Sequence, residues 1–155
     1  MSPDRARAVR AVLAGGLVAG TLDIIAAFVV YGLRGAAPLR ILQAIASGLL
    51  GADAFRGGLP AAALGLALHF FIATVAAGVY YAASGRLAIL VTRPVLSGLV
   101  YGIVVYVVMN FVVLPLSAVA KRPFAPGIAA IILVVHMVCV GLPIALVVRH
   151  HRARV

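Results

Sequence analysis

Acidic residues are scarce in this sequence: only three of its 155 residues are Asp or Glu, against 13 Lys and Arg. The chain has no paired carboxylates for general acid–base catalysis, and it lacks the HExxH, GxSxG and P-loop motifs of known enzyme classes. Ser84, Ser97 and Ser117 have no histidine and acid near them in the sequence. We therefore expect a protein that is not an enzyme.

The sequence also contains few cysteines and few charged residues. Cys139 is the single cysteine, so no intramolecular disulfide can form. Cysteine usage therefore does not indicate whether the protein resides in an oxidising or a reducing compartment. Only 10% of the residues are charged, 65% are hydrophobic and the mean hydropathy is +1.22. These values lie far from those of soluble domains and indicate an integral membrane protein.

The hydrophobic residues are grouped into four long stretches. Each can cross a hydrocarbon core of about 30 Å, which requires about 20 helical residues. We expect an all-α polytopic membrane protein whose single domain, residues 1–155, is a bundle of four transmembrane helices. The predicted spans are residues 10–31, 60–81, 94–114 and 128–148. They leave no room for a separate soluble domain.

A shorter apolar segment, residues 38–51, lies between the first two predicted spans. As a helix it would measure about 21 Å, which is too short to cross the membrane. Its apolar stripe consists of Ile41, Leu42, Ile45 and Leu49, and its other face contains Arg40, Gln43 and Ser47. Pro38 suits a helix start and Gly51 a helix end. The segment is predicted to be an interfacial or re-entrant helix.

Basic residues flank the predicted spans. The net charge of +10 comes without interleaved aromatic residues, so we expect no nucleic-acid partner. Basic loops beside membrane spans set topology and bind anionic lipid headgroups. Eight residues on one side against five on the other favour both termini in the cytoplasm. The eight are Arg5, Arg7, Arg10, Arg86, Arg93, Arg149, Arg152 and Arg154, and the five are Arg34, Arg40, Arg56, Lys121 and Arg122.

The two halves of the chain resemble each other. GLVAG (residues 16–20) opens the first span and GLVYG (residues 98–102) opens the third. His69 and His136 then fall at matching places in the second and fourth spans. These matches predict a two-fold internal repeat whose parallel halves are related by an axis along the membrane normal. Chance similarity in so biased a composition is the alternative.

Three ionisable residues are predicted to lie at one depth in the membrane. At about 1.5 Å per residue, Asp23, His69 and His136 lie about 12–14 Å from the same membrane face, and Tyr106 joins them. Small residues that let helices approach closely share the faces of Asp23 and Tyr106. These are Gly16 and Gly20 in the first span and Gly98 and Gly102 in the third. We therefore expect the polar layer inside the bundle.

The sequence leaves several roles open for this layer. We favour translocation or sensing of a proton or small ion, because histidine titrates near neutrality and intramembrane ionisable groups usually mark function. Alternatively, His69, His136 and Cys139, with Asp23, bind a metal ion, or the two histidines bind haem. No cofactor is the simplest expectation. The runner-up is an accessory or packing subunit of a larger membrane complex, or a homo-oligomer.

Four segments carry a resemblance to a known family. They are LVAGTLDI, ILQAIASGLLG, YGIVVYVVMNFVVLPLSA and HMVCVGLPIAL. Together they resemble a family of small, uncharacterised bacterial integral membrane proteins, and the resemblance covers nearly the whole chain. It implies a bacterial inner-membrane protein with four helices, and it implies no activity, cofactor or catalytic residue.

Overall fold

The computed structural model describes residues 2–120 and 125–153. No strand occurs within these ranges, and four helical stretches are long and apolar enough to cross a membrane. The prediction of an all-α membrane protein with four spans is therefore confirmed. The four stretches are Pro3–Gly32, Gly58–Ser84, Pro94–Leu116 and Pro126–Arg152.

Each span consists of one helix or of several consecutive helical segments. The first span is α1 (Pro3–Gly32) and the second is α3 (Gly58–Ser84). The third joins α5 (Pro94–Val108), the π-helical η2 (Met109–Val113) and α6 (Leu114–Leu116). The fourth joins α7 (Pro126–Val135), the π-helical η3 (His136–Gly141) and α8 (Leu142–Arg152). Proline opens α1, α5 and α7, where its missing N–H leaves no helical hydrogen bond unmade.

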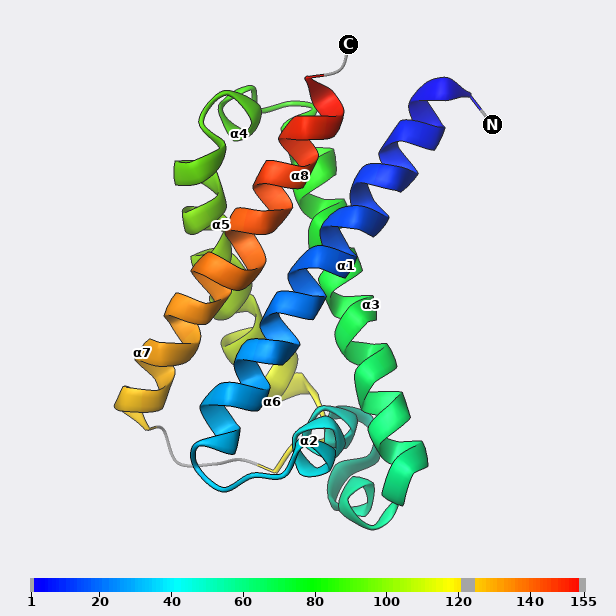
Figure 1. Cartoon of the computed structure of the whole chain (residues 1–155), viewed down its shortest axis with the longest axis vertical. Helices are drawn as coiled ribbons and strands as arrows, with labels where there is room; N and C mark the ends of the chain where they lie inside the picture. The colour runs from blue at the N-terminus through cyan, green and yellow to red at the C-terminus, as the bar shows by residue number, and fades with distance from the viewer. Residues whose placement is uncertain (1, 121–124, 154–155) are drawn as a thin grey trace.

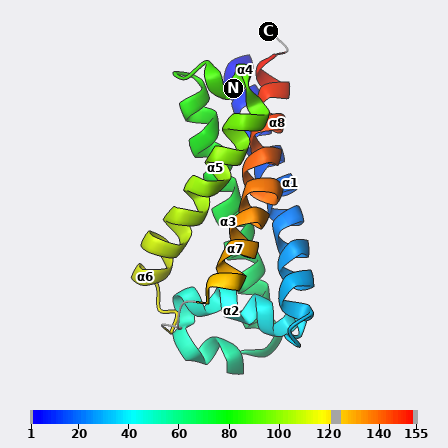
Figure 2. The ribbon, with the colours of Figure 1, turned by 90° about the vertical axis from the view of Figure 1, so that its left-hand side faces the viewer.

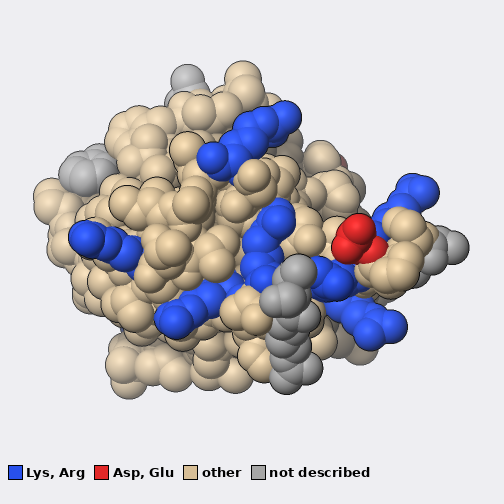
Figure 3. Space-filling view, turned by 90° about the horizontal axis from the view of Figure 1, so that it is seen from above, with Lys and Arg blue, Asp and Glu red and all other residues tan. Residues whose placement is uncertain are grey.

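Both termini lie at the same end of the bundle. From that end α1 and α5 run toward the opposite end, and α3 and the α7–α8 helix run back (Figure 1). Seven basic residues lie at the terminal end, where Figure 3 shows Lys and Arg spread over the surface: Arg5, Arg7, Arg10, Arg86, Arg93, Arg149 and Arg152. Arg34, Arg40 and Arg56 belong to the opposite end. Lys121, Arg122 and Arg154 fall outside the described residues.

The first two spans pack closely through glycine. A Cβ atom placed on Gly16 would lie 2.6 Å from Cα of Thr74, and one on Gly20 would lie 2.7 Å from the ring of Phe70. Both distances are too short for a methyl group: at Gly16 it would meet the α3 backbone, and at Gly20 it would force the Phe70 ring to shift. In a membrane such contacts supply much of the attraction between helices.

The third and fourth spans pack through glycines in the same way. A Cβ atom on Gly98 would lie 2.8 Å from Cα of Leu142, and one on Gly102 would collide with the backbone of Met137. Gly141 meets this contact from the fourth span, facing Gly98 and Gly102. Both GxxxG pairs predicted from the sequence are thus used between helices of one chain.

The short helix α2 (Pro38–Leu50) forms at the predicted place. It runs across the end of the bundle opposite the termini (Figure 2) and is followed by the 3₁₀-helix η1 (Gly51–Arg56). α2 crosses α3 at Gly65, where a Cβ atom would lie 3.1 Å from the backbone nitrogen of Ala46. The backbone N–H of Ala118 donates to the carbonyl of Gly48 at 2.9 Å, which ties α2 to the end of the third span.

The faces of α2 differ from the predicted division. Gln43 and Ser47, assigned to a face separate from the apolar stripe, are buried, whereas Leu49 of that stripe is 64% exposed. Each of the two side chains finds one backbone partner, whereas the Gln43 Oε1 atom is buried without one among the described residues. The Gln43 amide donates to the carbonyl of Gly58 at 3.1 Å, and the Ser47 hydroxyl to that of Ala44 at 2.7 Å. An exposed leucine has no cost where the surroundings are lipid.

Two tyrosines hold α3 against its neighbours near the terminal end. Tyr80 is fully buried, and its hydroxyl donates to the carbonyl of Leu90 in α4 (Ile89–Thr92) at 2.9 Å. Tyr101 of α5 donates to the carbonyl of Ala76 at 2.7 Å and packs edge-on against Tyr80, with ring centroids 4.9 Å apart. The buried hydroxyls are thus satisfied by backbone carbonyls of other segments.

The glycine contacts predict a specific loss of stability. Gly102→Ala should lower the free energy of unfolding by about 1–3 kcal/mol, because the methyl group overpacks the contact with Met137. Gly32→Ala is the matched control, since a Cβ atom there has nothing within 4 Å. Thermal unfolding in detergent should show a lower Tm for Gly102→Ala only. Equal Tm values for the two variants would contradict the observed packing.

Candidate functional site

A cavity of about 90 Å³ lies inside the bundle and gathers the predicted polar residues. Asp23 reaches it from α1, His69 from α3 and His136 from η3. Its remaining lining is apolar and includes Ile45 of α2 and Val105 of α5. Three ionisable side chains from three different spans therefore face one small space.

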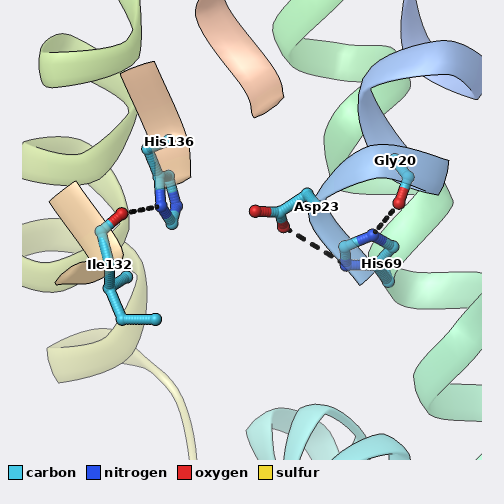
Figure 4. Close-up of polar contacts among 5 residues, drawn as sticks. All are labelled: Gly20, Asp23, His69, Ile132 and His136. Atoms are coloured by element: carbon cyan, nitrogen blue, oxygen red, sulfur yellow. Dashed lines mark hydrogen bonds and ion pairs between the residues drawn. The ribbon is translucent and has the colours of Figure 1, made fainter. Parts of the chain in front are cut away.

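Asp23 and His69 form the closest pair in the cavity. The Asp23 Oδ2 atom lies 4.0 Å from His69 Nδ1, and these side chains are 21% and 12% exposed. On its other side, the His69 ring places Nε2 2.8 Å from the carbonyl oxygen of Gly20 (Figure 4). A carbonyl oxygen can only accept, so Nε2 carries a hydrogen. In the neutral ring, Nδ1 then turns a lone pair toward the carboxylate.

His136 faces Asp23 from the other side of the site. Figure 4 shows the Asp23 carboxyl group between the two imidazole rings. His136 Nδ1 lies 2.9 Å from the carbonyl oxygen of Ile132, one turn earlier in the same span, so Nδ1 donates there and Nε2 is the acceptor of the neutral ring. Tyr106 packs edge-on against the His136 ring, with centroids 5.7 Å apart. Tyr106 supports this histidine without lining the cavity.

The helix around His136 is irregular for an identifiable reason. η3 begins at His136 and is followed by Leu142–Pro143; η2 ends just before Leu114–Pro115. Proline has no N–H and its ring clashes with the carbonyl four residues earlier, and a wider turn relieves both problems. Each Leu-Pro pair was thus a sequence signal for a π-helical segment near the cavity that periodicity alone did not reveal.

The predicted metal-ligand set is not assembled. Cys139 is half-buried and is absent from the lining of the cavity. Its three-residue spacing from His136 would keep both on one face of an α-helix, but residues 136–141 form a π-helix. Across the described ranges, no three His, Cys, Asp or Glu side chains are grouped to hold a metal ion.

Haem does not fit between the two histidines. The cavity measures about 90 Å³, whereas pockets for drug-sized ligands occupy about 300–1,000 Å³. His69 also directs Nε2 to the Gly20 carbonyl instead of the cavity. The residues present suit a ligand the size of a few atoms.

One contributor to the site could not be found from side chains. The carbonyl of Gly20 orients His69, yet the sequence predicts only a helix-packing role for Gly20. The two roles are connected, because the missing side chain lets α3 approach until a ring on α3 reaches the α1 backbone. Ile45 of α2 was likewise not expected to line the site.

Comparison with known proteins adds no assignment. The chain matches no protein-family model, no curated protein and no solved structure. The resemblance to small bacterial membrane proteins therefore stays a prediction, and the role of the cavity has to be argued from its geometry.

The two histidines are predicted to adopt opposite tautomers. At a pH where both rings are neutral, ¹⁵N NMR of the detergent-solubilised protein should show His69 protonated on Nε2 and His136 on Nδ1, because each donates to a carbonyl. His150 serves as the surface reference, because it is exposed and its side chain interacts only with the His151 ring among the described residues. Finding His69 protonated on Nδ1 would contradict its contact with Gly20.

Proposed function

We propose that this integral membrane protein binds a proton at the Asp23–His69 pair and translocates it through the bundle. The observation that carries the proposal is the orientation of His69, whose Nε2 is committed to the Gly20 carbonyl while Nδ1 lies 4.0 Å from the Asp23 carboxylate. Without an added proton, two largely buried acceptors face each other.

The energetics favour holding one proton at this pair. An ionised carboxylate inside a membrane costs about 2.5–3.5 kcal/mol on insertion scales, so a bare charge on Asp23 needs compensation. A proton on His69 Nδ1 makes an ion pair, and a proton on Asp23 removes the charge. One water between the two groups would let the proton pass from one to the other. His136 faces Asp23 across the cavity and would accept the proton after the Asp23–His69 pair.

A purely structural role for Asp23 has less support. Within the described residues no protein group donates a hydrogen bond to its carboxylate, and 4.0 Å to His69 is too long for one. A residue that only tied helices together would be expected to make such a bond. The accessory-subunit alternative relied on free glycine faces, and the four glycines concerned, Gly16, Gly20, Gly98 and Gly102, are used within the chain.

We further propose a bacterial inner-membrane location with both termini in the cytoplasm. Positively charged residues collect on the cytoplasmic side of membrane proteins. Among the described residues, seven basic side chains belong to the terminal end of the bundle and three to the opposite end. Measuring the activity of reporter enzymes fused to the C-terminus tests this orientation: a periplasmic reporter that is active there would reverse it.

Proton flux in liposomes tests the main proposal. Wild-type protein should carry protons down a pH gradient, and Asp23→Asn should reduce the rate roughly 100-fold, because the amide cannot accept the proton. Asp53→Asn is the matched control, since Asp53 is an exposed acid of η1 paired with Arg56. A fluorescent pH dye inside the liposomes reports the rate. Equal proton flux through the wild-type protein and Asp23→Asn would contradict the proposal.

A further inference from the structure

The cavity offers hydrogen-bond acceptors and no free donors. His69 and His136 each use the one N–H of the neutral ring on a backbone carbonyl, Gly20 or Ile132. The nitrogen left on each ring is therefore an acceptor, and the Asp23 carboxylate accepts only. The other lining side chains are Ala, Ile, Val and Met. A ligand that satisfies this lining has to donate hydrogen bonds and carry positive charge.

The size of the cavity limits such a ligand to a few atoms. A volume of about 90 Å³ is enough for a small cluster of waters. Ammonium or methylammonium fits within it, alone or with a water. The alkyl chain of a longer amine would have to extend beyond the cavity.

The spacing of the closest acceptors suits an N–H donor. Asp23 Oδ2 and His69 Nδ1 are 4.0 Å apart. For a donor atom about 2.8 Å from both, the angle between the directions to the two acceptors is about 90°. Two N–H bonds of an ammonium ion diverge by about 110°, so each hydrogen bond would bend by only about 10°, which stays within the favoured range. One cation can therefore donate to the carboxylate and the imidazole together.

We infer that the cavity binds ammonium or a short primary alkylammonium ion, held by Asp23 and His69, with His136 facing the same cavity. This inference rests on the proposed function, because it assigns a second ligand to the same site: the cation occupies the place of the proton. Hard metal cations are a poorer match, because they prefer oxygen ligands and the groups on either side of Asp23 are imidazoles. Transition metals would need a larger ligand set, and no three His, Cys, Asp or Glu side chains are grouped to hold a metal ion in the described residues.

The proton should compete with ammonium. The titratable groups that face the cavity are Asp23 from α1, His69 from α3 and His136 from η3, and Tyr106 packs behind His136. The Cys139 thiol of η3 lies outside the lining but interacts electrostatically with Asp23. α2 and η2 contribute only Ile45 and Met109. Ammonium needs the carboxylate ionised and the imidazoles neutral. Its apparent affinity should therefore fall as protons fill these groups at lower pH.

Thermal stability of the purified full chain at fixed pH tests the inference. Ammonium chloride should raise Tm saturably, because a ligand that binds only the folded state stabilises it. Potassium chloride is the matched control, since K⁺ has nearly the same ionic radius and cannot donate hydrogen bonds. Methylammonium should act like ammonium, and butylammonium should not. An equal shift with potassium and ammonium would overturn the inference.

Variants separate this inference from the proposed function. Asp23→Asn should weaken ammonium binding roughly 10- to 100-fold, since a charge-assisted hydrogen bond is lost, while Asp53→Asn should leave it unchanged. If Asp23→Asn fails to fold, the ammonium, potassium and butylammonium comparison on wild type still decides. Asp23-dependent proton flux without any ammonium-specific shift would overturn only the cation inference. Ammonium binding without proton flux would overturn only the translocation.

Discussion

The close approach of α1 and α3 at Gly20 is the contact on which the site depends. Gly20 has no side chain, so Phe70 of α3 packs directly over it and the neighbouring His69 ring reaches the Gly20 carbonyl. That hydrogen bond selects the ring nitrogen that faces Asp23. A property of helix packing, the absence of one Cβ atom, thereby decides which atoms are available for proton chemistry.

The two halves of the bundle share the glycine contact, although His136 bonds to Ile132 of its own span and not to a glycine carbonyl. Gly20 packs on Phe70, the residue after His69, and Gly102 packs on Met137, the residue after His136. α1 and α5 also run in the same direction, as parallel repeats require (Figure 1). The matching contacts agree with the internal repeat predicted from the sequence. In each half, the histidine lies one residue before the residue that packs on the glycine, and both histidines line the same cavity.

The halves differ at the one position that carries charge. Asp23 lies three residues after Gly20, and Val105 lies three residues after Gly102, and both side chains line the cavity. α2 is inserted in the first half only and closes one side of the cavity with Ile45. An approximately symmetric scaffold thus holds a single carboxylate between two imidazoles, which suits a site for one cation.

The sequence by itself determined the class of protein and the depth of its polar residues. Long apolar runs can be satisfied in lipid only as helices, and a constant rise per residue turns sequence position into depth. Asp23, His69 and His136 could therefore be grouped before any contact was known. The small faces around Gly20 and Gly102 likewise predicted which sides of the helices meet.

Only the tertiary structure decided the chemistry within that layer. Which nitrogen of His69 faces Asp23, and at what distance, depends on a carbonyl 49 residues earlier in the chain. The exclusion of Cys139 depends on a π-helical turn, and the burial of Gln43 on a carbonyl of Gly58. Backbone carbonyls are present at every residue, so the sequence cannot show which of them a side chain will meet. Packing alone makes that choice.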